Sequence, residues 1–181
     1  EIAKEKGYEV LLLDSPIVSH LIQKLEGDNE KMTFTRVDSD HIDNLIKKEE
    51  TQISKLSDDE KENLKTVVEA IVPKPTYSVQ MEALDSNAAP FIITQPEFMR
   101  RMKEMSQTGG SGMFGMGNMP EMYNLVVNTN SELAATILKN EDKSAQESLV
   151  KQALDLAKIS QGLLKGEELT AFVKRSFELI K

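Results

Sequence analysis

Few residue patterns in this sequence could support catalysis, and each lacks part of what its chemistry requires. Gly110, Gly112 and Gly115 match the GxGxxG pattern, in which the chain backbone approaches a dinucleotide pyrophosphate. That chemistry needs a strand directly before the glycines and a helix directly after them. A polar, glycine-rich stretch surrounds them instead. We therefore interpret this stretch as a loop and predict no nucleotide site.

The two histidines are the next candidates, for general-base or zinc chemistry. Neither His20 nor His41 has a second histidine one helical turn away, which is the spacing that holds zinc on a helix. His20 is close in sequence to Asp14 and Ser15, but a nucleophile, its base and the orienting acid normally come from separate elements. The chain has no cysteine to serve as thiolate ligand or nucleophile. We predict that this chain is not an enzyme and holds no metal or cofactor.

Composition excludes further classes of function. The 181 residues carry a formal net charge of −8, which disfavours binding to nucleic acid or to an anionic membrane. No apolar run reaches the roughly 18 residues that span a bilayer. The absence of cysteine suits a reducing compartment, and the first residues resemble neither a natural start nor a secretory signal. We expect a cytoplasmic protein that binds neither nucleic acid nor membrane, cut from a longer chain.

Elements that could position functional residues fall into two predicted domains, residues 1–55 and 56–181. The first domain is expected to be a small α/β unit, because runs of strand length alternate with helical apolar spacing. Its strands are expected at 8–14 and 32–38, and its helices from Ser15 to Gly27 and at 40–55.

The second domain begins with a helix-start signal. Ser57 followed by Glu60 forms a capping box, and the helix that it starts should end before Pro73. Residues 77–84 then alternate apolar and polar side chains, as in a sheet with one wet face. Further strands are expected at 90–94 and 122–128, and helices at 131–140, 144–164 and 167–181. The predicted fold class is α+β, with a short, mainly antiparallel sheet packed with helices and a C-terminal helix pair.

A methionine-rich segment, residues 95–122, is the first unusual feature. It holds seven of the nine methionines and five of the nine glycines. Its first part can form an amphipathic helix, and the apolar side of that helix is either an ordinary core face or a binding face. The glycines that follow disfavour regular structure. Methionine side chains adapt to irregular apolar partners, so we predict a protein-binding segment. The candidate binding residues are Phe98, Met99, Met102, Met105, Met113, Phe114, Met116 and Met119.

The terminal helix pair is the second unusual feature. Its apolar residues cover more than one side of a helix, so two copies of the chain could bury them together in a four-helix bundle. The alternative is that both helices close over the sheet of their own domain. The candidate dimer-interface residues are Leu149, Ala153, Leu154, Leu156, Ala157, Leu163, Leu164, Leu169, Phe172, Val173, Phe177 and Ile180.

Several segments together resemble the ninety-kilodalton heat-shock chaperones, and the bacterial type most of all. These segments are YEVLLLDSPI, FMRRMKEM before the glycine-rich loop, MYNLVVNTNSELAATIL, and ALDLAKISQGLLKGEELTAFVKRSFELI, in that order over essentially the whole chain. The resemblance implies the end of a middle domain followed by a C-terminal dimerisation domain.

The same resemblance implies a function. The final two helices would form a homodimeric four-helix bundle, and the helix and loop from Phe98 to Met122 would contact client protein. ATP and Mg would bind in an N-terminal domain that this chain lacks, so the parent chaperone would be the ATPase. The rival hypothesis is a monomeric structural or adaptor domain, in which the methionine-rich segment is a tolerated insertion.

Overall fold

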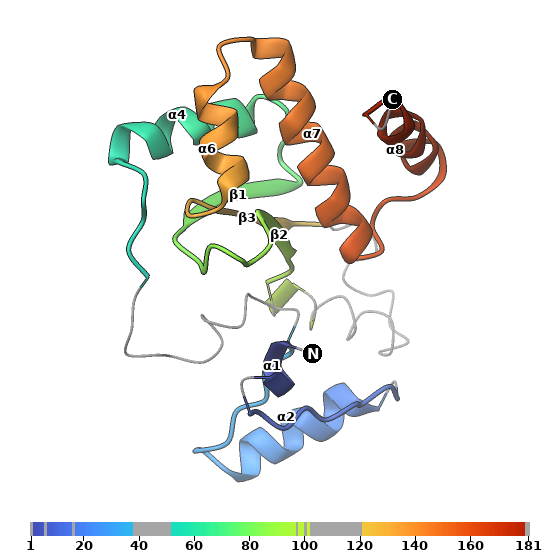
Figure 1. The fold of residues 1–181 in the computed structure, drawn as a ribbon. Helices are drawn as coiled ribbons and strands as arrows, with labels where there is room; N and C mark the ends of the chain where they lie inside the picture. The colour runs from blue at the N-terminus through green and yellow to red at the C-terminus, as the bar shows by residue number, and fades with distance from the viewer. Residues whose placement is uncertain are drawn as a thin grey trace. The chain divides into compact units, whose positions relative to one another are not determined.

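The chain divides into two compact units in the computed structural model (Figure 1). One unit comprises residues 1–49 and 94–123, and the other comprises 50–93 and 124–181. The predicted boundary between residues 55 and 56 stays a prediction. The structure describes residues 2–5, 7–15, 17–37, 52–96, 98, 99, 101 and 121–179.

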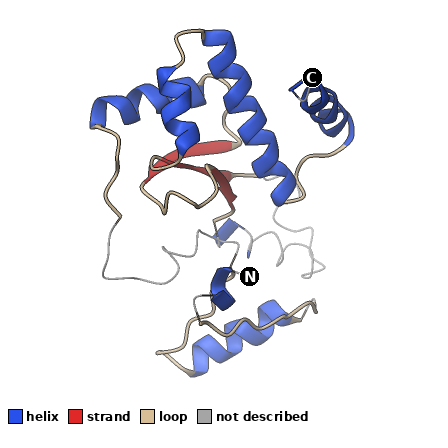
Figure 2. Cartoon of the chain, viewed as in Figure 1, coloured by secondary structure: helices blue, strands red, loops and turns tan. Residues whose placement is uncertain are grey.

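The larger unit is a three-stranded sheet with helices packed on one side (Figure 2). The strands stand in the order β1-β3-β2, and α4 packs on β1 and against α6 and α7. Fully buried side chains such as Leu64, Leu125 and Ile137 fill the space between these layers. The elements are α4 (Asp58–Glu69), β1 (Tyr77–Glu82), β2 (Phe91–Thr94), β3 (Tyr123–Asn128), α6 (Glu132–Lys139), α7 (Lys143–Ser160) and α8 (Gly166–Leu179).

Hydrogen bonds at the end of β3 define the strand directions. The Thr129 amide donates to the carbonyl of Glu82, the last residue of β1, and the Asn128 amide donates to the carbonyl of Pro90, just before β2; both distances are 2.8 Å. The C-terminal end of β3 therefore lies beside the end of β1 and the start of β2. It follows that β1 runs parallel to β3 and β2 runs antiparallel to it. The predicted mainly antiparallel sheet is antiparallel in only one of its two pairings.

Local signals explain where most helices begin. The predicted capping box is confirmed: the Ser57 hydroxyl accepts from the Glu60 amide, and the Glu60 carboxylate accepts from the Ser57 amide. Ser131 caps α6 and Asp142 caps α7 in the same way, each through a side-chain oxygen. The expected alternation along β1 is also confirmed, with Ser78 exposed between half-buried neighbours.

The predicted end of α7 near residue 164 is wrong. The helix ends at Ser160, because Gly162 adopts a left-handed conformation with φ of 64°. The amides of Gly162 and Leu163 donate back to the carbonyls of Ile159 and Lys158 at 2.9 and 2.8 Å, which is the Schellman pattern of helix termination.

The described part of the smaller unit contains α1 (Ile2–Glu5) and α2 (Val18–Asp28), and its only described strand residues are Thr94 and Tyr123, which belong to β2 and β3. The strands predicted at 8–14 and 32–38 are wrong over the residues that the structure describes. Leu11 and Leu12 in the first stretch are exposed, and a strand requires a hydrogen-bonded neighbour that the apolar pattern alone does not supply. The expected α/β arrangement is therefore not found there.

Of the two helices predicted in the smaller unit, one is found in the structure. The helix expected from Ser15 is α2, but its N-cap is Ile17, which has no side-chain capping bond. Most of the helix predicted at 40–55 lies outside the described residues, and residues 52–55 are not helical.

Candidate functional site

Within the described residues, the candidates first considered for catalysis do not form an active site. His20 and its sequence neighbours Asp14 and Ser15 are exposed, while His41 and Gly110, Gly112 and Gly115 lie outside the described residues. Among the residues that the structure describes, no three His, Cys, Asp or Glu side chains stand close enough to hold a metal ion. In that same part of the chain, no helix combines the length and apolarity needed to cross a membrane.

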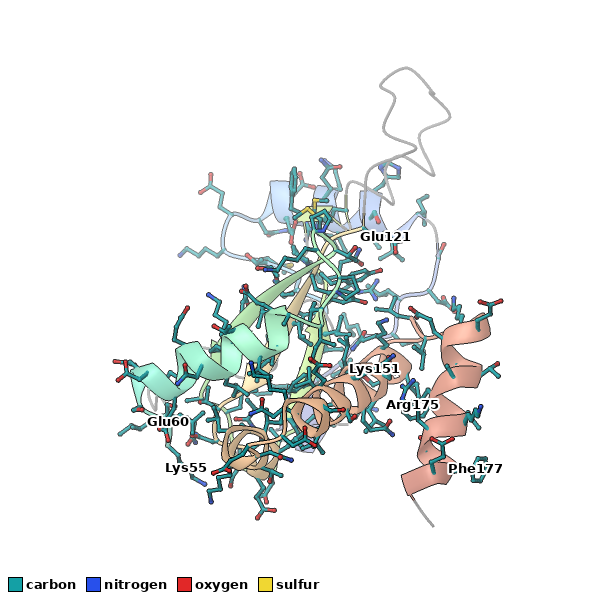
Figure 3. The ribbon with its side chains drawn as sticks, turned by 90° about the horizontal axis from the view of Figure 1, so that it is seen from above. Lys55, Glu60, Glu121, Lys151, Arg175 and Phe177 are labelled. Carbon is teal, nitrogen blue, oxygen red and sulfur yellow. The ribbon has the colours of Figure 1, made fainter. Side chains whose placement is uncertain are left out.

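The surface formed by α7 and α8 is the strongest candidate for an interaction site. No residue from 166 to 178 on α8 is buried. The described contacts between these helices are polar: Gln152 donates to Ser176 at 3.0 Å, and Lys158 pairs with Glu168 at 3.3 Å. Arg175 also pairs with Asp155. These polar contacts join α8 to α7 (Figure 3).

This attachment leaves apolar side chains of α8 turned outward. Arg175 points toward α7, whereas Phe177 points away from it on the opposite side of α8 (Figure 3). Phe177 is 65% exposed, and Val173 and Leu169, one and two helical turns earlier, are exposed as well. An amphipathic helix whose apolar side is exposed to solvent is typical of a binding surface.

The predicted dimer-interface residues separate into three groups. Ala153, Leu154, Ala157 and Leu164 are buried inside the unit, and Leu149, Leu163 and Phe172 are half-buried. Leu156, Leu169, Val173 and Phe177 are exposed, and Ile180 lies outside the residues whose side chains are described. The exposed group lies on α7 and α8, and the fully buried residues serve the core of a single chain.

Only the start of the methionine-rich segment is described. Phe98 is 69% exposed, and Met99 is half-buried. The other candidate binding residues, Met102, Met105, Met113, Phe114, Met116 and Met119, lie outside the described residues. The exposed Phe98 ring is the part of the predicted protein-binding surface that the structure places.

An ion pair holds this helical turn, a feature that the sequence analysis missed. Arg101 approaches Glu26 with Nη1–Oε2 and Nη2–Oε1 distances of 3.0 and 3.3 Å. The hydrogen bond from Arg101, and after it that from the Phe34 amide, hold the pKa of the Glu26 carboxyl below its usual value. No local pattern reveals a pairing between residues so distant in sequence.

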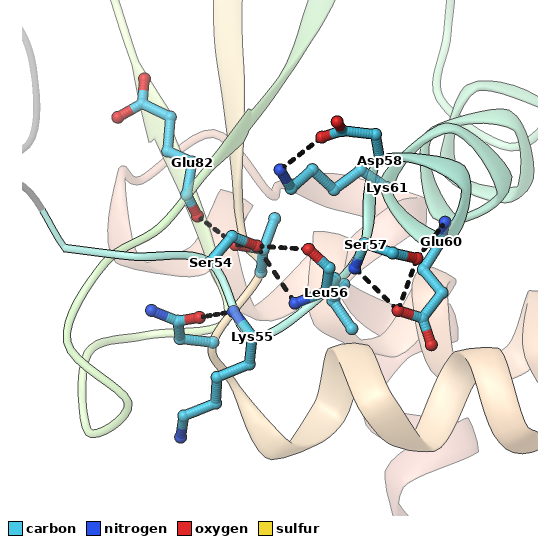
Figure 4. Close-up of polar contacts among 10 residues, drawn as sticks. Ser54, Lys55, Leu56, Ser57, Asp58, Glu60, Lys61 and Glu82 are labelled. Atoms are coloured by element: carbon cyan, nitrogen blue, oxygen red, sulfur yellow. Dashed lines mark hydrogen bonds and ion pairs between the residues drawn. The ribbon is translucent and has the colours of Figure 1, made fainter.

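A buried polar joint fixes the entry of the chain into the larger unit (Figure 4). We define it as the side chains of Ser54, Asn128, Thr129 and Asn130 with their backbone partners. Ser54 donates to Thr129 Oγ1 at 2.9 Å, and Asn130 Oδ1 accepts from the Lys55 amide at 2.7 Å. These contacts are structural, because every polar side chain in the joint is engaged within the chain.

Comparison with known proteins finds relatives that are all named chaperones. No family model matches the chain. Chaperone protein HtpG from Bacteroides fragilis is 32% identical over 99% of this chain, and that from Bacteroides thetaiotaomicron is 33% identical over the same share. Chaperone protein HtpG from Porphyromonas gingivalis is 43% identical over 92% of the chain.

The matched segment is a limited part of these relatives. The chain spans 36% of the length of the Bacteroides proteins and 24% of the Porphyromonas protein. The expected resemblance is confirmed: the chain is homologous to a C-terminal part of the HtpG chaperones, the bacterial type of the ninety-kilodalton heat-shock chaperone family.

Proposed function

We propose that this chain is the dimerisation and client-holding part of a molecular chaperone. The observation that carries the proposal is the outward apolar stripe of α8, formed by Leu169, Val173 and Phe177. The names of the relatives support a role in protein folding.

A second copy of this chain is the partner that fits the stripe. Polar contacts from α7 occupy one side of α8, so the stripe of one copy can meet α7 and α8 of another across a two-fold axis. Leu156 on α7, which is exposed in the single chain, would add to such an interface. The product is a four-helix bundle, in which each helix buries the apolar face that one chain leaves open.

Client holding is assigned to the start of the methionine-rich segment. Phe98 offers an exposed ring, and Met99 beside it offers an adaptable thioether side chain. Dimerisation would present two such surfaces to one unfolded chain, and two linked weak contacts bind far more tightly than one.

ATP binding and hydrolysis are proposed to reside in the longer parent protein. The chain spans 36% of the length of the Bacteroides relatives. As the chaperone resemblance implies, ATP and Mg would bind in an N-terminal domain of the parent protein. The segment itself would act in the cytoplasm by association alone.

Light scattering with paired variants tests the dimer. Phe177→Asp places a charge within the proposed interface, whereas Ala171→Asp adds the same charge to an exposed position on another side of α8. We expect a shift to monomer for Phe177→Asp and an unchanged dimer for Ala171→Asp. A stable dimer in both variants contradicts the assigned surface, and a monomeric parent chain favours the adaptor hypothesis.

A further inference from the structure

Three segments of the smaller unit meet at the side chain of Arg101. Its guanidinium contacts both carboxylate oxygens of Glu26 on α2, at 3.0 and 3.3 Å. It also donates to the Phe34 carbonyl at 3.2 Å. The Phe34 amide donates to the Glu26 carboxylate at 2.8 Å, which closes the arrangement. We call these three residues the Arg101 clamp.

The clamp has the geometry of a specific ion pair. A planar guanidinium that meets both oxygens of a carboxylate forms two charge-assisted hydrogen bonds, which fix orientation as well as distance. The side chains of Arg101 and Glu26 are only 34% and 21% exposed. In contrast, the Lys24–Asp28 pair on the same helix is 74% and 55% exposed and has a single short contact of 3.0 Å. Exposed pairs of that kind contribute little to stability.

The clamp lies next to the side chains proposed to bind client. Arg101 stands three residues after Phe98, so the two side chains project from adjacent positions on the same helical turn. Met99 is half-buried on that turn, while Phe98 remains exposed. Holding Arg101 therefore also sets the direction in which Phe98 projects.

We propose that Arg101 is a positioning residue for client binding, which holds Phe98 in a fixed presentation through its clamp to Glu26 and Phe34. This inference rests on the proposed client-holding function of the Phe98 turn. A preorganised apolar side chain binds more tightly than a free one, because less freedom is lost on binding.

The test uses four variants of the full chain. Glu26→Gln and Arg101→Gln break the clamp, Arg101→Lys keeps the charge but loses the planar fork, and Lys24→Gln removes the exposed pair as a matched control. Affinity is measured by fluorescence polarisation with labelled, reduced and carboxymethylated lactalbumin, which stays unfolded. Hydrogen exchange of the Phe34 amide reports on the clamp itself, and circular dichroism reports on folding.

We expect each Gln variant at the clamp to weaken lactalbumin binding about fivefold and to speed Phe34 exchange by a similar factor, the effect of one partly buried charge-assisted pair. Arg101→Lys should fall between these variants and the parent, and Lys24→Gln should match the parent. All four should keep the parent circular dichroism spectrum.

A fifth variant separates the two ways of failing. If Phe98→Ser weakens lactalbumin binding but the clamp variants leave both binding and Phe34 exchange unchanged, the positioning role is overturned. If Phe98→Ser has no effect on binding, client holding by this turn fails, and with it the positioning role. Faster Phe34 exchange in the clamp variants would then still establish the clamp as a structural contact.

Discussion

Replacing Asn130 with alanine should destabilise the larger unit more than most single substitutions do. Its side chain is buried and makes three hydrogen bonds to backbone of distant segments. Nδ2 donates to the carbonyls of Ile53 and Leu84 at 3.1 and 3.0 Å, and Oδ1 accepts from the Lys55 amide at 2.7 Å. Alanine removes all three partners at once.

The size of the stability loss depends on whether water can reach the backbone groups that lose their hydrogen bonds. A buried polar group left without a partner costs about 1–3 kcal/mol. The hydrogen bond to the Leu84 carbonyl is buried, so water cannot replace it. The hydrogen bonds to the Ile53 carbonyl and from the Lys55 amide are partly buried, so water can replace part of the lost hydrogen bonding there. We therefore expect a loss of about 3 kcal/mol in the free energy of unfolding, mainly from the Leu84 carbonyl and the small cavity.

Urea unfolding followed by far-ultraviolet circular dichroism measures this loss. Asn87→Ala is the matched control, because Asn87 is exposed in a turn and its loss should change stability by less than about 0.5 kcal/mol. A decrease below about 1 kcal/mol for Asn130→Ala, with an unchanged m-value, would refute the reasoning, since it would mean that water satisfies the released groups.

Two further predictions concern a titrating group and a backbone conformation. The pKa of Glu26 is held below its usual value of 4.5 by Arg101, so the clamp should be fully formed above pH 4.5 and be lost as the pH falls through the lower folded-state pKa. Phe34 amide exchange measured against pH should show this loss, and Glu26→Gln should abolish the pH dependence. Gly162→Ala should destabilise the chain by about 1 kcal/mol in thermal unfolding, because Gly162 has a φ of 64°. Gly27→Ala, inside α2 with open space around it, should instead be neutral or slightly stabilising, and equal effects at the two glycines would contradict this account.

Sequence reasoning located the elements whose signals are local. Ser57 and Glu60 predicted the start of α4 because a capping box needs only four consecutive residues. The end of α7 was missed, because Leu163 and Leu164 continue the apolar spacing beyond Gly162, where the backbone reverses. The strand predicted at 8–14 failed for a related reason: apolar composition indicates a preference and does not supply a neighbouring strand.

The candidate sites show the same limit. The apolar pattern of the terminal helices predicted an excess of apolar surface, but not which residues remain exposed. Leu154 is buried against its own unit, whereas Phe177 is exposed. This difference in exposure follows from the packing of α7 and α8 and not from the apolar pattern. The Arg101 clamp and the polar joint bring together residues far apart in sequence, so no local spacing could predict either.

The mass of the chain in solution tests the central claim most directly. Light scattering across a dilution series should give a particle of twice 20.3 kDa at high concentration, which dissociates on dilution and is monomeric throughout in Phe177→Asp. A mass of 20.3 kDa for the parent chain at every concentration would contradict dimerisation through α8, and the exposed stripe would then require a different partner.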